Sequence, residues 1–226
     1  RDAPLHLHLS EQRAENQACL AATGRTPTAL ADAAGVLGPR TTAVHATHLT
    51  PNDITRLGTT RTTACLCPTT ERDLADGIGP AHALANAGTP LCLGSDSHAV
   101  IDLFEEARAV ELDERLSTER RGHHRAEDLL AAATTTGMQA LGWQAGRLAP
   151  GHLADLVTVT LDSPRLAGAA PADLVDHLVF AATAADVTHV TVGGTQIVED
   201  GRHLLIHDVP AALSRAIHAL DAGVAG

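Results

Sequence analysis

The sequence predicts an α/β protein that contains half of a (β/α)₈ TIM barrel. Four short apolar runs read as strands, and each of the four is followed by a segment with helical patterning. Because strands that alternate with helices over short connections pair in parallel, these units form one sheet with right-handed crossovers. A complete barrel has eight such units and needs roughly 250 residues. The predicted strands are 4–9, 41–46, 62–67 and 90–95.

The segments between and after these strands carry the signals of helices. The segment that begins near Thr50 has a side chain suited to an N-cap, from Thr50 or Asn52. The segment before it stops near Gly38 and Pro39, which end helices. We expect helices over 13–24, 26–37, 50–58, 78–88, 100–116 and 126–142.

The pattern changes after Gly146. The stretch 146–161 combines Gly and Pro turns with a Val/Thr strand, and 177–205 reads as short strands around a Gly193-Gly194 hairpin. We therefore divide the chain into a partial barrel over 1–145, a small β domain over 146–208 and a C-terminal helix over 209–226.

The composition limits the possible partners. The formal net charge is −11, which disfavours nucleic acid and anionic membranes because both reward basic surfaces. No apolar run reaches the roughly 20 residues of a transmembrane helix. Four cysteines without a CxxC pair indicate reduced thiols. We expect a cytoplasmic protein with a small-molecule substrate, no nucleic-acid or membrane partner, and a homodimer when full length.

Polar residues follow the predicted strands at the ends where barrel active sites lie. His8 ends the first strand and Glu11 comes three residues later, His45 ends the second, and Asp96 follows the fourth. Imidazole suits zinc, and a catalytic zinc ion leaves one position open for water. A histidine, an acid or base, a second histidine and a carboxylate at successive strand ends together predict metal-assisted hydrolysis.

Each of these residues also has a simpler reading. A lone HxH is a weak signal, so His6 is read as a core residue, and Glu11 or Asp96 alone could cap a helix. His45 and His48 are three residues apart, so at most one of them faces the site. Cys65 and Cys67 match no usual zinc motif and are assigned to the core.

With these residues in place, the sequence resembles the amidohydrolase superfamily in its deaminase branch. "HLSE" (His8 to Glu11), "VHATHL" and "LGSDSHA" resemble the motifs of strands five, six and eight, and "GRLAPGHLADLVTV" resembles the companion β domain. The resemblance implies one zinc ion, or a similar divalent metal, bound by His8 and Asp96. It also implies that Glu11 protonates the leaving nitrogen, that His45 orients the attacking water and that Asp96 takes its proton.

The same resemblance implies which half of the barrel is present. The family's HxH motif of strand one is absent: His6 and His8 are followed by Glu11, as strand five requires, and only three further strands follow. We therefore expect the C-terminal half of an enzyme, strands five to eight, and no activity from this chain alone.

The stretch "PTTERDLADGI" (68–78) separates members of the branch. Purine and triazine hydrolases usually read Pro-Ser-Asn there, so we expect a deiminase that hydrolyses a C–N bond of a linear amidine. Two alternatives stay open: a deaminase or chlorohydrolase of a guanine-, cytosine- or triazine-like heterocycle, and a catalytically inactive fragment. Aromatic residues make up only 1% of the chain, which disfavours stacking of a flat ring.

Overall fold

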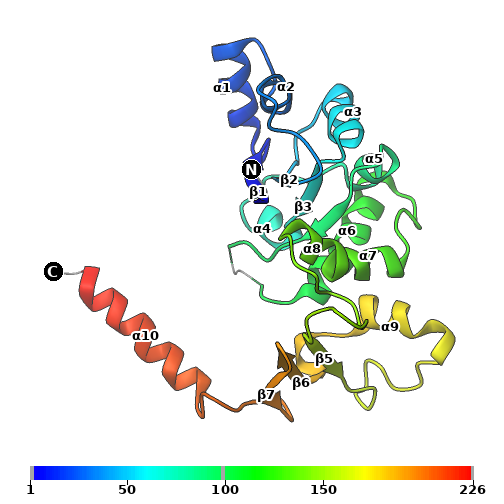
Figure 1. The fold of residues 1–226 in the computed structure, drawn as a ribbon, viewed down its shortest axis with the longest axis vertical. Coiled ribbons are helices and arrows are strands. Elements are labelled where there is room, and N and C mark those ends of the chain that lie inside the picture. Colours follow the sequence, from blue (N-terminus) through cyan, green and yellow to red (C-terminus); the bar gives the residue numbers. More distant parts are fainter. Residues whose placement is uncertain (1–2, 98–99, 225–226) are drawn as a thin grey trace.

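The first half of the molecule is a sheet of four parallel strands with helices packed against it (Figure 1). The computed structural model describes residues 3–97 and 100–224. Each strand pairs in parallel with the next along the chain, so the predicted α/β fold and all four strands are confirmed. The strands are β1 (Leu5–Leu9), β2 (Thr41–His45), β3 (Thr63–Leu66) and β4 (Leu91–Leu93).

Helices fill every connection between these strands. Thr50 forms a complete capping box with Asp53, which fixes the start of the helix that follows β2. The helices are α1 (Arg13–Thr23), α2 (Pro27–Ala33), α3 (Pro51–Thr60), α4 (Pro68–Asp73), α5 (Ala81–Asn86), α6 (Leu103–Thr118), α7 (Ala126–Ala133) and α8 (Thr135–Ala140).

Two predicted elements differ in the structure, and one observed helix was not predicted. The predicted helix 126–142 is broken at Thr134, whose φ of −127° and ψ of −90° are not helical. The predicted strands of 177–205 begin instead as a helix, α9 (Leu174–Ala181), because a short apolar run suits a buried helix as well as a strand. The short helix α4 was not predicted.

The outer face of the parallel sheet packs against the helices through small aliphatic residues. Alternate strand residues point to opposite faces, and the outward set joins α3 and α5 in one buried cluster. At Gly58 a side chain would collide with the backbone carbonyl of Ala87, so glycine permits close packing of α3 and α5. The cluster comprises Leu9, Ala43, Ala46, Leu57, Ala64 and Leu84.

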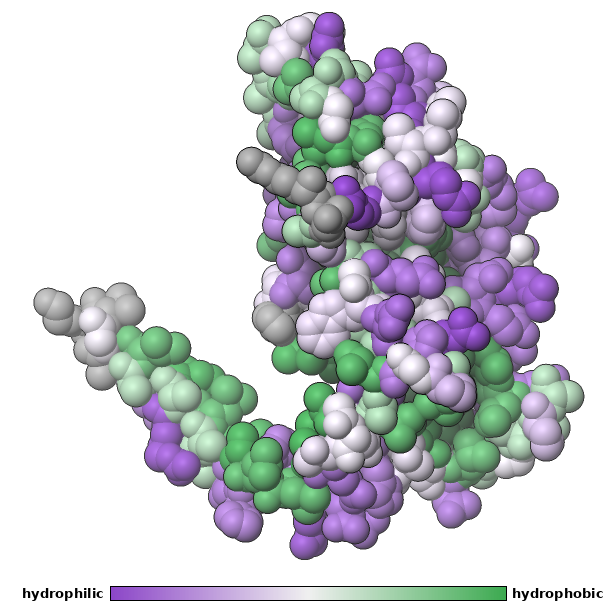
Figure 2. All heavy atoms as spheres, in the orientation of Figure 1, coloured by the Kyte–Doolittle hydropathy of each residue, from purple (hydrophilic) through white to green (hydrophobic). Residues whose placement is uncertain are grey.

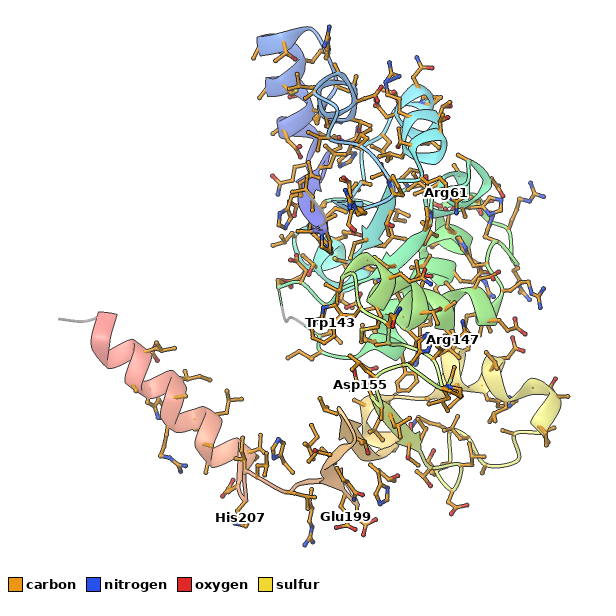
Figure 3. All side chains as sticks on the ribbon, viewed as in Figure 1. Arg61, Trp143, Arg147, Asp155, Glu199 and His207 are labelled. Atoms are coloured by element: carbon orange, nitrogen blue, oxygen red, sulfur yellow. The ribbon has the colours of Figure 1, made fainter. Side chains whose placement is uncertain are left out.

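The second half holds a small antiparallel sheet and a separate helix. Its strands are β5 (Leu156–Val159), β6 (Val187–Val192), β7 (Thr195–Glu199) and β8 (Arg202–His203), and a Gly193-Gly194 turn joins β6 to β7. Figure 3 shows Trp143, Arg147 and Asp155 along the link from the first sheet. Short 3₁₀ turns, η1 (Pro171–Asp173) and η2 (Ala184–Asp186), precede α9 and β6.

The last helix, α10 (Val209–Val224), extends away from both sheets (Figure 1). Its apolar side chains gather along one face (Figure 2), with Leu213, Ile217 and Leu220 all exposed. Across the described ranges 3–97 and 100–224, no helix combines the length and the apolar character that a membrane span requires.

Candidate metal-binding active site

The backbone is strained where the strands of the first sheet end. Ser10, His45, Ala46 and Asp96 all have positive φ, at 54°, 67°, 52° and 45°. Residues other than glycine seldom adopt this region, and when they do they cluster at functional sites. The strain turns the chain sharply after β1, β2 and β4, so their polar residues converge at one end of the sheet.

Three of the predicted site residues form one compact group. The candidate ligand atoms of His8, His45 and Asp96 all lie within 4.8 Å of one another. The rings of His8 and His45 stack with 5.3 Å between centroids. His45 is fully buried, and its Nε2 atom lies 3.8 Å from Oδ2 of Asp96.

Glu11 lies beside this group. Its Oε1 atom is 3.6 Å from Nε2 of His45, and its side chain is 22% exposed, so solvent can reach it. Burial and the neighbouring charge of Asp76 raise the pKa of Glu11, against the opposing charge of His45. A carboxyl group with a raised pKa can hold a proton for delivery to a leaving group.

Glu71 fixes the ring of His45 from the other side. Oε1 of Glu71 lies 3.4 Å from Nδ1 of His45 and accepts the backbone N–H of Cys67 at 3.0 Å. Although burial opposes charge on His45, the hydrogen bond to Glu71 and the charges of Glu11 and Asp96 raise its pKa. Because Nδ1 faces a carboxylate, Nε2 is left free to face the site.

Helix α4, which follows β3 directly, connects the site to the scaffold. Thr69 donates through its backbone N–H and its hydroxyl to the buried carboxylate of Glu106 on α6. Thr70 accepts from the backbone N–H of Ser97 at 3.1 Å and donates to the carbonyl of Ser95, the two neighbours of Asp96. Together with Glu71, these consecutive residues of α4 therefore bind α6, the loop after β4 and the ring of His45.

Sequence reasoning placed His8, Glu11, His45 and Asp96 at strand ends but missed the roles of Glu71 and Asp76. Both lie in the 68–78 stretch, where the sequence predicts a strand end and a choice of substrate but no contact with His45 or Glu11. A signal was available, because Glu71 follows a predicted strand at the same end of the sheet. His48 points elsewhere: its Nε2 donates to the carbonyl of Asp76 at 2.8 Å. His98 and Ala99, within the "LGSDSHA" motif, lie outside the described residues.

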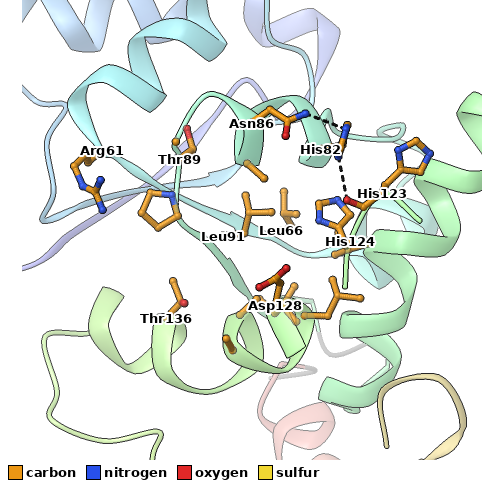
Figure 4. Close-up of a pocket in the computed structure, with 18 residues that line it drawn as sticks. Arg61, Leu66, His82, Asn86, Thr89, Leu91, His123, His124, Asp128 and Thr136 are labelled. Carbon is orange, nitrogen blue, oxygen red and sulfur yellow. Dashed lines mark hydrogen bonds between the residues drawn. The ribbon is translucent and has the colours of Figure 1, made fainter. Parts of the chain in front are cut away.

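A second group of histidines lines a cavity of about 470 Å³ away from this site (Figure 4). Both ring nitrogens of His82 are engaged, by the carbonyl of His123 at 3.1 Å and the amide of Asn86 at 2.9 Å. His123 pairs with Thr118 at 2.8 Å. These partners occupy both ring nitrogens of His82 and one of His123, whereas Nε2 of the third histidine, His124, is buried without a hydrogen-bond partner in the described part of the chain.

The donor set at the strand ends suits a metal ion. It combines two imidazoles with a carboxylate, and zinc binds both histidine nitrogen and carboxylate oxygen. Nε2 of His45 is buried and has no hydrogen-bond partner within the described part of the chain. An enclosed nitrogen of this kind is costly unless something binds it, and a bound ion or its water would satisfy it.

The fold and this site match one family. The model of the amidohydrolase family matches residues 1–197, which is most of the chain. The chain therefore belongs to the amidohydrolase family.

Individual relatives differ in their substrates. The chain is 36% identical over 209 residues to formimidoylglutamate deiminase of Pseudomonas aeruginosa, covering 89% of this chain and 46% of that protein. It is 33% identical to 5-methylthioadenosine/S-adenosylhomocysteine deaminase of Natronomonas pharaonis, covering 99% and 49%. A zinc-bound adenosine deaminase of Xanthomonas campestris superimposes with a TM-score of 0.88 at 29% identity, covering 96% and 50%. The chain thus spans about half the length of the relatives it matches.

Proposed function

We propose that this chain forms part of a zinc-dependent deiminase that hydrolyses N-formimidoyl-L-glutamate to N-formyl-L-glutamate and ammonia, a step of histidine degradation. The observation that carries the proposal is the free Nε2 of His45, enclosed between Glu11 and Asp96. We also propose that the active protein has the length of its relatives and closes a full barrel, with further metal ligands outside residues 1–226.

In this proposal each site residue has a separate task. His8 and Asp96 hold the metal, which when bound supplies Lewis acidity that lowers the pKa of water toward about 7. Nε2 of His45 orients the attacking water, and Asp96 accepts its proton. Glu11 then donates a proton to the departing nitrogen as general acid, a role that its raised pKa supports.

Two observations favour a linear amidine over a ring as substrate. The 68–78 stretch contributes Asp76 next to Glu11, where a polar substrate would lie. The three aromatic residues of the chain, Phe104, Phe180 and Trp143, lie on α6, on α9 and after α8. None of them lies in the described loops directly after β1, β2 or β3, so the chain offers few surfaces on which a flat ring could stack.

The adenosine-type deaminases are the second candidate, because several relatives carry that activity by name.

The two carboxylates of N-formimidoyl-L-glutamate need cationic partners, and one arginine near the site is already engaged in this chain. Arg72 pairs with Glu105 at 3.0 Å and Asp113 at 3.1 Å, so its guanidinium is not directed to substrate.

The test is a comparison of substrates. A polypeptide of the relatives' length that contains this chain should release ammonia from N-formimidoyl-L-glutamate much faster than from 5-methylthioadenosine, adenosine, guanine or cytosine. Faster turnover of any of the purines or pyrimidines would replace the linear amidine with a heterocycle. Absence of turnover with every substrate in a zinc-loaded, folded protein would favour the inactive alternative.

A further inference from the structure

Three of the four cysteines lie together on the inner face of the parallel sheet. Cys65 on β3 is paired in register with Cys92 on β4, and residues paired in this way point to the same face. Cys67 follows Cys65 by two residues and shares that face. Cys67 and Cys92 are 1% and 2% exposed, whereas Cys65 is partly open to solvent.

The sulfur atoms converge on Cys65. Cys65 is the register partner of Cys92 on the next strand, and the neighbouring thiols of Cys67 and Cys92 lower the pKa of Cys65. A side chain at Gly94 would come within 3.2 Å of Sγ of Cys67 and 3.4 Å of Sγ of Cys65. Glycine at this position therefore leaves room over a pair of sulfurs.

This arrangement differs from the proposed zinc site in both chemistry and geometry. Among the residues that the structure describes, only His8, His45 and Asp96 bring three donor atoms within 4.8 Å of one another. The thiols instead approach as pairs that share Cys65. Two soft sulfur donors select soft ions, of which Cu(I) is the biological example.

We propose that Cys65, with Cys67 or Cys92 as its partner, is a second metal site that binds a thiophilic ion of the Cu(I) class. Binding displaces the thiol protons and forms two metal–sulfur bonds without a change of oxidation state. In the 226-residue chain Cys65 is the partly exposed member of the group, so an ion reaches it first from the inner face of the sheet.

The second site is coupled to the first through one hydrogen bond. The backbone N–H of Cys67 donates to Glu71, and Glu71 holds the ring of His45. An ion that draws Cys67 toward Cys65 shifts this donor. Occupation of the thiol site is therefore expected to disturb His45, and soft metals are expected to inhibit the proposed deaminase without displacing its zinc.

The test uses the 226-residue chain under anaerobic, reducing conditions, with Cu(I) supplied as its coloured bicinchoninate complex. The chain should bleach the complex by withdrawing a stoichiometric amount of Cu(I). Cys65→Ser should abolish this withdrawal. The double variant Cys67→Ser with Cys92→Ser, which leaves Cys65 alone, should abolish it too and gives a second reading if Cys65→Ser does not fold.

Two variants serve as controls. Cys19→Ser removes the remaining cysteine, which lies on α1 and bonds Thr23, and should withdraw Cu(I) like the parent. His8→Ala damages only the histidine site and should also withdraw Cu(I) like the parent. The proposal is overturned if Cys65→Ser retains Cu(I), if His8→Ala loses it, or if Cys65 forms a disulfide in the reduced parent. Neither deaminase activity nor zinc content enters this reading, so failure here leaves the proposed function standing.

Discussion

The two sheets contain similar aliphatic residues but bury them very differently. Every residue of β2 and β3 is buried except Val44 and Cys65, whereas no residue of β5, β6 or β7 is buried. Helices cover the outer face of the parallel sheet, as parallel sheets require. The residues of β5, β6 and β7 in the antiparallel sheet are all partly or fully exposed to solvent.

This difference decides where chemistry can occur. An enclosed setting strengthens electrostatic interactions and makes an unpaired polar group costly, so buried polar side chains are held in fixed geometry. Strand β2 and helix α4 hold His45, Glu71 and Thr70 in this way. Among the described residues of the second half, Asp186 is buried and charged. Its partners are Arg165 and the backbone N–H of Thr183.

The largest difference in activity is expected when a glutamate is replaced by glutamine in each of the two regions. In a polypeptide of the relatives' length, Glu11→Gln should retain zinc but lower ammonia release by about 10²–10⁴-fold, because the leaving nitrogen is no longer protonated. The matched change Glu199→Gln, on exposed β7, should leave the rate unchanged. Near-parental turnover of Glu11→Gln would remove Glu11 from the mechanism.

Packing provides the next contrast. Leu57 on α3 is completely buried against the parallel sheet, so Leu57→Ala should lower the free energy of unfolding by about 2–5 kcal/mol. Leu156→Ala on β5, where the side chain is 38% exposed, should cost less than about 1.5 kcal/mol. Urea denaturation of the two variants compares them directly, and equal losses would refute the difference in burial.

A smaller effect is expected at Glu71. Glu71→Gln keeps the shape but removes the charge opposite Nδ1 of His45, so metal affinity or turnover should fall by about 10–100-fold, as for other partners of site histidines. Nitrogen NMR of His45 should show a changed tautomer balance, which a merely structural role would not produce. The control Glu127→Gln, at an exposed position of α7, should leave the His45 signals in place.

The fold was easier to predict than the site. Alternation of apolar residues and short connections were enough for all four strands of the first sheet, because parallel pairing follows from that order. His8, Glu11, His45 and Asp96 were recognisable because each lies at the end of a strand or just beyond it. Glu71 and Asp76 were missed because their roles depend on contacts between β2, α4 and the loop after α4, which a linear pattern does not show. Helix α9 was mistaken for a strand because its apolar run is short.

The smallest expected effect is a loss of stability in the second half of the chain, at Asp186. Asp186 accepts two hydrogen bonds from Arg165, at 3.0 and 2.7 Å, and these with the N–H of Thr183 hold its pKa well below the usual range. Arg165 is 43% exposed, so solvent screens the pair, and Asp186→Asn should cost about 1–2 kcal/mol.

The pH dependence of that cost has a fixed sign. Because the pKa of Asp186 is lower in the folded state, its contribution is complete above about pH 4 and declines as the pH falls below that value. The difference in stability between parent and Asp186→Asn should therefore shrink in acid. A difference that grows as the pH falls would contradict the ion pair.

The central claim is that the ends of β1, β2 and β4 build a metal site, and cobalt binding tests it most directly. Titration with Co²⁺ of a polypeptide of the relatives' length that contains this chain should give a saturable visible absorption that His8→Ala and Asp96→Ala both abolish. His6→Ala is the matched control: it lies two residues from His8 on the same strand, and its Nε2 bonds the carbonyl of Ala140 at 2.9 Å. The account predicts that His6→Ala binds Co²⁺ as the parent does. Loss of the signal in His6→Ala, or its persistence in His8→Ala, would contradict the account.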